Sequence, residues 1–180
     1  MVIINSFLEV TFADYFVLRW VSAGTVFIFS YTAHRRFTFS DTKEVGIAVY
    51  AKKSEDLDEV WSKVKEYPDF IHIDIVDKTF NKKAEPVDIS KIREIKKRWN
   101  LKKVAHIMSK RPTKWIKQIY ENVDEIIFHS DISEQIPDVI QLCESYGRKS
   151  GICILPTSDV NSLKSYLDRI STVQILGISN

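Results

Sequence analysis

Three of the four histidines in this chain stand in three successive short apolar segments. His72 lies in the run FIHIDIV, His106 in VAHIM and His129 in EIIFH. Asp74 follows His72 by two residues, so on an extended strand their side chains share one face while the isoleucines cover the other. Imidazoles and carboxylates are ligands that zinc and other transition metals take in proteins. The pattern therefore predicts a metal site rather than three separate buried histidines.

These side chains must be positioned by alternating apolar strands and amphipathic helices. Six strands are predicted, at residues 45–51, 69–77, 102–109, 124–131, 150–156 and 171–179. Five helices are predicted between them, at residues 54–67, 87–99, 112–121, 132–147 and 159–170. The alternation indicates βαβ units and a parallel sheet, although periodicity leaves a doubly wound sheet and a barrel both open. In a barrel, His72 and Asp74 point inward near the carboxyl end of their strand, where barrel enzymes carry their chemistry.

Capping residues mark the ends of several predicted helices. Ser54, followed by acidic residues, is predicted to cap the helix at 54–67. Pro112 is typical of the first turn of a helix, and Gly147 of the position just after the last turn. These signals place the loops that connect the helices to the strands.

The charge balance gives no sign of a nucleic-acid partner. The chain has 26 basic and 24 acidic residues, which leaves a net charge of +2. Basic residues cluster at 91–103, where the solvated face of an amphipathic helix accounts for them. Cys143 and Cys153 have neither metal-site spacing nor a paired framework, so they are interpreted as ordinary buried or half-buried thiols in a reducing cytosol.

Residues 1–40 differ from the rest of the chain. They contain no lysine, and residues 15–33 form a stretch with one charge, Arg19, near its start. A run of about 20 apolar residues spans a bilayer as a helix, so this stretch predicts a hydrophobic, membrane-spanning helix. The basic residues 34–36 place the following part of the chain in the cytoplasm. A buried helix of a soluble domain is the alternative, and the chain would then be cytoplasmic.

The end of this segment resembles the close of the last transmembrane helix in the GtrA family. The resemblance rests on a Tyr–(x)₃–Arg-Arg-Phe–x–Phe pattern that begins at Tyr31. Members of that family are small four-helix membrane proteins linked to polyprenyl-linked sugar transfer. By this resemblance, residues 1–40 would be the tail of a GtrA-like domain and would attach the chain to a membrane.

Residues 45–180 resemble the ribulose-phosphate 3-epimerase family. That family carries His-x-Asp-x-x-Asp-Gly-x-Phe on its second strand, His-Leu-Met-x-x-x-Pro on its third, a histidine on its fourth and Gly-x-x-Leu-x-Pro-x-Thr on its fifth. The matching residues are His72, Asp74, Asp77, Phe80, His106, Met108, Pro112, His129, Gly151, Ile154, Pro156 and Ser158. The resemblance implies an α/β fold, an incomplete TIM (β/α)₈-type barrel with about six β/α units, preceded by the hydrophobic N-terminal helix.

The same resemblance implies a metal-dependent isomerase site. His72, Asp74 and His106 would bind one divalent metal ion (Zn, Fe, Mn or Co), and Asp74 would also be one of two acid/base groups. Met108 and His129 would contact the substrate, a phosphorylated ketose. Epimerisation beside a ketone removes a proton from one face and returns one to the other through an enediolate, so it needs two such groups. Assembly as a homo-oligomer stays open.

Departures from the family pattern argue against full activity of the chain as given. Ala48, Lys78, Leu155 and Leu176 replace a Ser, a Gly, an Asn and a Met of the family. The family's second acid/base aspartate comes from a seventh strand, and its phosphate-binding loops follow strands seven and eight; the sequence ends before them. Asp77 has the opposite strand parity to Asp74 and is not expected to substitute. The chain is therefore expected to have no appreciable epimerase activity, as a truncated part of a longer barrel.

Two other functions remain open on the same fold. One is a non-catalytic barrel that binds a sugar phosphate or serves as a scaffold attached to a membrane sugar-transfer protein. The other is a related decarboxylase or hexulose-phosphate synthase, families that use an Asp-x-Lys-x-x-Asp run on one strand. Here Lys78 follows Asp77 directly, so that spacing does not fit.

Overall fold

The computed structural model describes residues 25–26, 30 and 44–177. The chain divides into two units, Met1–Lys43 and Glu44–Asn180, and the second contains the sheet. The predicted membrane helix at 15–33 lies outside the described residues except for Thr25, Val26 and Ser30. Among the residues that are described, no helix combines the length and the apolar character needed to cross a bilayer. The membrane-spanning helix and the GtrA resemblance thus stay predictions.

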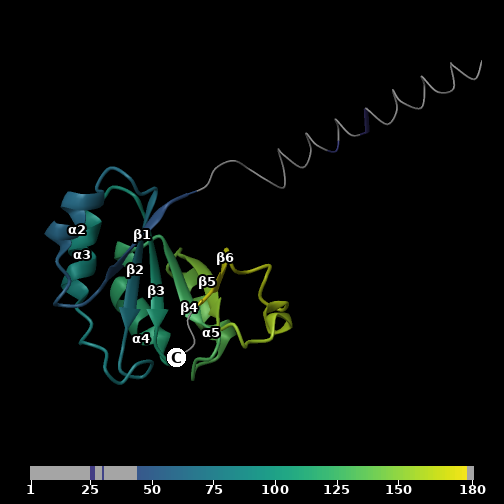
Figure 1. The fold of residues 1–180 in the computed structure, drawn as a ribbon. Helices are drawn as coiled ribbons and strands as arrows, with labels where there is room; N and C mark the ends of the chain where they lie inside the picture. Colours follow the sequence, from purple (N-terminus) through teal and green to yellow (C-terminus); the bar gives the residue numbers. More distant parts are fainter. Residues whose placement is uncertain (1–24, 27–29, 31–43, 178–180) are drawn as a thin grey trace, which may run out of the picture. The chain divides into compact units, whose positions relative to one another are not determined.

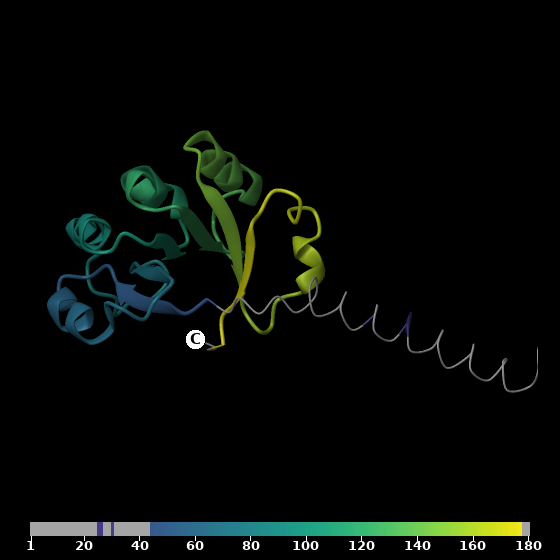
Figure 2. The same cartoon turned by 90° about the horizontal axis from the view of Figure 1, so that it is seen from above.

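Six parallel strands form one sheet in the order in which they occur along the chain (Figure 1). The strands are β1 (Gly46–Tyr50), β2 (Phe70–Val76), β3 (Lys102–Met108), β4 (Glu125–His129), β5 (Lys149–Ile154) and β6 (Thr172–Ile175). The sheet curls, and the helices lie along its convex side (Figure 2). A doubly wound sheet would instead reverse its strand order and carry helices on both faces. The fold is therefore an incomplete α/β barrel, as the sequence predicted.

Four α-helices connect the first five strands. They are α2 (Leu57–Val64), α3 (Ile89–Arg98), α4 (Pro112–Ile119) and α5 (Ile136–Ser145), with a short 3₁₀ helix η2 (Tyr120–Asn122) after α4. Pro112 opens α4 as predicted. Gly147 follows α5 with φ of 65°, and its N–H donates to the Glu144 carbonyl, which confirms the predicted helix end.

Two local predictions were wrong. Ser54 does not cap α2: its hydroxyl donates to Glu85, and Asp56 accepts the N–H groups of Asp58 and Glu59 instead. The predicted helix at 159–170 is only a 3₁₀ helix, η3 (Val160–Leu163), followed by turns. Its sequence is rich in Asn, Ser and Asp, which bond to nearby backbone groups and favour turns over an α-helix.

The outward face of the sheet forms the main core. The isoleucines of β2, Ile71, Ile73 and Ile75, are fully buried, and they share one apolar cluster with side chains of the covering helices such as Ile92 and Ile116. Each such side chain contributes about 1.5–3 kcal/mol when it leaves water. Burial of these alternate residues fixes the parity of β2, because a slip by one residue would turn every isoleucine away from the helices. The residues between them therefore face the concave side.

Candidate active site

Strand register brings the predicted site residues to one level of the concave face. Asp74 on β2 is the direct partner of His106 on β3, and two residues further on Val76 pairs with Met108. His72 lies one pleat before Asp74 on the same face. Asp74, His106, Val76 and Met108 stand in the carboxyl-terminal halves of β2 and β3, the end at which barrel enzymes place their chemistry, whereas His72 lies in the amino-terminal half of β2.

One carboxylate oxygen joins the two imidazoles. Asp74 Oδ1 lies 3.3 Å from His72 Nε2 and 3.1 Å from His106 Nδ1. The two histidine rings meet edge to face with their centroids 5.4 Å apart. His106 is buried, while His72 and Asp74 are half-buried and reach the concave surface. The structure thus brings His72, Asp74 and His106 together, whatever role they have.

The surroundings of Asp74 favour its ionised form. Burial alone would raise the pKa of this carboxyl group, but hydrogen bonds from His106 and His72 outweigh burial and hold the pKa below its ordinary value. Asp74 is therefore a carboxylate at neutral pH. In that form it can either bind a cation or accept a proton from a substrate.

These three residues also fit a divalent metal ion. One ligand atom from each of His72, Asp74 and His106 lies within 4.8 Å of the others, and the donors are two nitrogens and an oxygen. A zinc or similar ion bonds such donors at about 2.0–2.2 Å, so small side-chain movements would close the set around it. The ionised state of Asp74 supplies the negative charge that such an ion requires.

The two predicted substrate contacts lie at different depths. Met108 ends β3, and its carbonyl accepts the N–H of Asp77. His129 is buried behind His106, with its Nε2 at 3.0 Å from His106 Nε2, and the ring of Phe80 packs edge-on against it at 4.7 Å. Burial and the neighbouring His106 lower the pKa of His129 to about 4, so its imidazole is neutral. Contact of either residue with a substrate remains a prediction.

Asp77 is occupied by structural contacts outside this site. Its carboxylate accepts hydrogen bonds from Ser109 Oγ at 2.6 Å and Trp115 Nε1 at 2.8 Å, and from the backbone N–H of Thr79 at 2.8 Å. Trp115 belongs to α4 on the convex side, so Asp77 turns away from Asp74 as its strand parity suggested. It ties the loop after β2 to β3 and α4.

A small cavity opens beside Asp74. Its volume is about 200 Å³, and its lining includes Asp74, Val76, Asn81 and two lysines, Lys52 and Lys83. Lys52 forms an ion pair with Glu85 at 3.3 Å. The cavity is thus lined by the Asp74 carboxylate and by charged groups, Lys52, Lys83 and Glu85, from the loops after β1 and β2.

Sequence reasoning missed three side chains near His106 and His129. Gln174 of β6 places its Nε2 3.4 Å from His106 Nδ1, Cys153 of β5 is the register partner of His129, and Asp131 lies 3.7 Å from His129 Nδ1. Parity gave a signal for Cys153 and Gln174, because both alternate with outward apolar residues. Register pairs Cys153 with both His129 and Gln174, but only the curl of the sheet brings Gln174 to His106.

Comparison with known proteins shows the family to which the chain belongs. A profile of the ribulose-phosphate 3 epimerase family matches residues 44–179. The ribulose-phosphate 3-epimerase of Buchnera aphidicola subsp. Baizongia pistaciae (strain Bp) is 24% identical over 135 residues, which cover 73% of this chain and 58% of that protein. The chain therefore spans little more than half the length of this curated relative.

A solved structure shares the fold. The phosphoribosyl anthranilate isomerase from Thermococcus kodakaraensis aligns with a TM-score of 0.50 and 16% sequence identity, over 77% of this chain and 67% of that one. At this identity the likeness concerns the arrangement of strands and helices and carries no information about the reaction.

Proposed function

Because the chain belongs to the ribulose-phosphate 3-epimerase family, we propose that its concave site binds a ketose phosphate and removes the proton beside the carbonyl group. The observation that carries the proposal is the contact of one Asp74 oxygen with both His72 and His106, at 3.3 and 3.1 Å. This arrangement keeps Asp74 ionised and fixes its position at the carboxyl end of the sheet.

In this proposal Asp74 is the acid/base group. A divalent ion held by His72, Asp74 and His106 would polarise the substrate's carbonyl group. The Asp74 carboxylate takes the proton from the adjacent carbon and returns it, and its lowered pKa keeps it in the accepting form at neutral pH. His72 and His106 orient the carboxylate and limit its rotation.

The cavity beside Asp74 offers a place for the substrate's charged end. Lys52 and Lys83 line it together with Asp74, so an anionic group on the lysines leaves the sugar carbons near the carboxylate. The lining holds two lysines and two carboxylates, Asp74 and Glu85, and Glu85 pairs with Lys52 at 3.3 Å. In this proposal Lys83 therefore meets the phosphate group while Asp74 faces the sugar carbons.

Within residues 44–177, Asp74 has no acidic counterpart placed to act on the opposite face of the substrate. Asp77 is bonded to Ser109 and Trp115, and Asp131 forms an ion pair with Lys110 at 2.5 Å. Glu85, the other acidic residue of the cavity, pairs with Lys52 at 3.3 Å and accepts a hydrogen bond from Ser54. A single acid/base removes a proton and returns it to the same face. Inversion of the carbon therefore needs a second group from outside these residues, whereas exchange of the proton with solvent does not.

Solvent exchange tests the proposal directly. The chain, loaded with Zn²⁺, Mn²⁺ or Fe²⁺, is incubated in D₂O with each of the two epimers, ribulose 5-phosphate and xylulose 5-phosphate, and deuterium at C3 is followed by NMR. We expect exchange in one epimer only, because the two present the C3 proton on opposite faces. Asp74→Asn should slow this exchange by about 10²–10⁴-fold.

Asp69→Asn provides the matched control. Asp69 precedes β2 at its opposite end, where its carboxylate accepts the Val45 N–H. Its amide variant should exchange at the wild-type rate. Exchange that persists in Asp74→Asn would contradict the assignment of Asp74. Binding of the sugar phosphate without any exchange would instead favour the non-catalytic barrel.

A further inference from the structure

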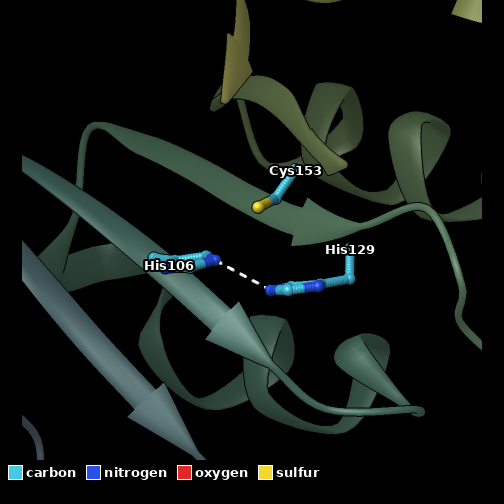
Figure 3. A group of neighbouring side chains, drawn as sticks. All are labelled: His106, His129 and Cys153. Atoms are coloured by element: carbon cyan, nitrogen blue, oxygen red, sulfur yellow. Dashed lines mark hydrogen bonds between the residues drawn. The ribbon is translucent and has the colours of Figure 1, made fainter. Parts of the chain in front are cut away.

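A second group of potential metal ligands lies directly behind the first. It consists of His106, His129 and Cys153, which come from the neighbouring strands β3, β4 and β5 (Figure 3). One ligand atom from each lies within 4.8 Å of the others, and all three residues are at most 1% exposed. We propose that these residues form a second, thiolate-containing site, which shares His106 with the first group, for a borderline or soft transition-metal ion such as Zn²⁺. This proposal goes beyond the epimerase-like reaction and does not require it.

The two imidazoles already have ligand spacing. Their rings are nearly parallel, at 7°, and face each other through Nε2 atoms 3.0 Å apart. Two nitrogens bound to one tetrahedral zinc ion at about 2.05 Å are separated by roughly 3.3 Å. Cys153 projects toward the gap between the rings (Figure 3). Without metal, one Nε2–H can donate across this gap to the other nitrogen, so the ion would occupy the place of a shared proton.

Only a small movement of the thiol is needed. Zinc binds sulfur at about 2.3 Å, which places a sulfur and a nitrogen ligand of one tetrahedral ion roughly 3.5 Å apart. The upper limit of 4.8 Å for the three atoms therefore corresponds to a shift of at most about 1.3 Å. A thiolate with two imidazoles is a soft ligand set, unlike the carboxylate-containing set at Asp74, and it selects Zn²⁺ or a copper ion over Mg²⁺ or Mn²⁺.

Each histidine of this second group has a carboxylate at its other nitrogen. His106 Nδ1 lies 3.1 Å from Asp74 Oδ1, and His129 Nδ1 lies 3.7 Å from Asp131 Oδ1. Metal-binding histidines commonly donate their second N–H to a carboxylate, which fixes the tautomer and strengthens the ligand. His129 Nδ1 is buried and has no hydrogen-bond partner in the structure. A metal ion on Nε2 would place a proton on this Nδ1, and Asp131 would have to approach by only about 0.8 Å to accept it.

The charge balance also favours a cation here. Burial, Asp131 and Asp74 raise the pKa of Cys153 to about 11, so without metal the residue is a neutral and unreactive thiol. The same two carboxylates that oppose a thiolate stabilise a divalent cation bound to it. On binding, the sulfur–metal bond forms, the thiol proton leaves to solvent, and the His129 proton moves from Nε2 to Nδ1. One proton is thus released for each ion bound.

His106 makes the two metal groups mutually exclusive. The group with His72 and Asp74 uses its Nδ1, whereas the group with His129 and Cys153 uses its Nε2. A neutral imidazole has one lone pair, so a proton sits on whichever nitrogen is not bound to metal. We therefore expect one ion per chain, at one group or the other, and a change of the His106 tautomer when the ion moves between them.

Cobalt(II) binding tests this site apart from the proposed reaction. The full chain carrying His72→Ala, which removes a ligand of the first group only, is titrated with Co²⁺ under reducing conditions. We expect thiolate-to-cobalt charge-transfer absorption in the near ultraviolet, one ion per chain and release of one proton. A second substitution, Cys153→Ala, should abolish the charge-transfer band.

Cys143→Ala on the same background is the matched control, because Cys143 is also fully buried and lies on α5. The band should persist in it at full intensity. Circular dichroism reports whether each variant is folded. If Cys153→Ala does not fold, a second measurement on the His72→Ala chain takes its place. The alkylation rate of each cysteine in mild urea is followed by mass spectrometry, with and without Zn²⁺. Zn²⁺ should slow alkylation of Cys153 at least tenfold and leave that of Cys143 unchanged.

Three results would overturn the proposal. They are a missing charge-transfer band in the His72→Ala chain at saturating Co²⁺, a band that survives Cys153→Ala, and equal protection of the two cysteines. None of these depends on sugar-phosphate exchange, so failure of the second metal site and failure of the proposed function are distinguishable.

Discussion

Replacing Asp77 by alanine should destabilise the chain without removing a metal ligand. Its carboxylate accepts hydrogen bonds from Ser109 and Trp115, and these join the loop after β2 to β3 and α4. Asp77 also stands in the family's second-strand motif, where it could be mistaken for part of the metal site. Its substitution therefore separates a structural role from a functional one.

The size of the effect follows from the two buried donors. Ser109 is fully buried and Trp115 is 8% exposed, so water cannot easily replace the lost acceptor. Each buried donor left unpaired costs about 1–3 kcal/mol. Thr79 is exposed, and loss of its contacts adds little. We expect Asp77→Ala to lower the free energy of unfolding by about 2–6 kcal/mol.

Urea unfolding followed by far-ultraviolet circular dichroism measures this change. Asp77→Asn is the matched control, because Ser109 and Trp115 both donate to the same oxygen, Oδ2, and an amide oxygen in its place can still accept both bonds. The amide nitrogen would then replace only the oxygen that accepts from the exposed Thr79, so this variant should lose clearly less stability than the alanine variant. Metal affinity of the folded protein, measured by Co²⁺ titration below the unfolding transition, should stay within about twofold of wild type for both variants, since the ligands and the carboxylates bonded to them are untouched.

Two outcomes would refute this reasoning. A loss of less than about 0.5 kcal/mol in Asp77→Ala, the range of ordinary surface substitutions, would mean that water satisfies Ser109 and Trp115. A loss of metal affinity as large as that of Asp74→Ala would mean that Asp77 turns into the site. The first result would refute the estimated stability cost, and the second would refute the separation of Asp74 and Asp77 by strand parity.

Three further predictions concern stability. The Glu125 carboxylate pairs with Lys102 at 2.6 Å and accepts hydrogen bonds from the hydroxyls of Ser171 and Thr172. Burial would raise the pKa of Glu125, but these contacts outweigh burial and lower that pKa. The ionised Glu125 therefore stabilises the fold above its unfolded pKa near 4.5, and this stabilisation is lost as the pH falls through the lower folded pKa. Glu125→Gln should lower the free energy of unfolding by about 1–3 kcal/mol at pH 7 and reduce the further loss of stability in acid. Urea titrations from pH 7 to pH 3 measure both effects. Ile73→Ala in the fully buried face of β2 should cost about 2–5 kcal/mol in the same assay at pH 7, and a cost below 1 kcal/mol would contradict the assigned parity. Gly147→Ala should cost about 1 kcal/mol because φ is 65° although the space around it is open, and an unchanged or higher melting temperature would show that the turn adapts.

The strands and their inward faces were predictable because burial imposes a simple pattern. Ile71, Ile73 and Ile75 leave only one orientation for His72 and Asp74 once helices cover the isoleucine side. The strand order and the curl of the sheet then followed from resemblance rather than from periodicity, which left a doubly wound sheet open.

Contacts between strands were less accessible to sequence reasoning. Cys153 looked like an ordinary buried thiol because its neighbours in the sequence contain no ligand, yet register places it opposite His129. The distance between them depends on how far β4 and β5 curl, and no local signal encodes that. Short polar side chains caused the other errors. Asp56, rather than Ser54, caps α2, and the Ser162 hydroxyl donates to the Asp159 carbonyl where a longer helix was predicted.

The sequential strand order has a consequence for how the sheet opens. Each strand pairs only with the strands before and after it in the chain, so the sheet behaves as a linear array in which an outer strand detaches without disturbing the far side. β6 has one strand neighbour among the described residues and exposes Val173 and Ile175 at 41% and 67%, whereas every residue of β4 is buried. Amide hydrogen exchange should therefore proceed inward from β6, with the amides of β3 and β4 exchanging last. His106 and His129 lie in β3 and β4, so the space between their rings remains closed to solvent while β6 detaches from the edge of the sheet.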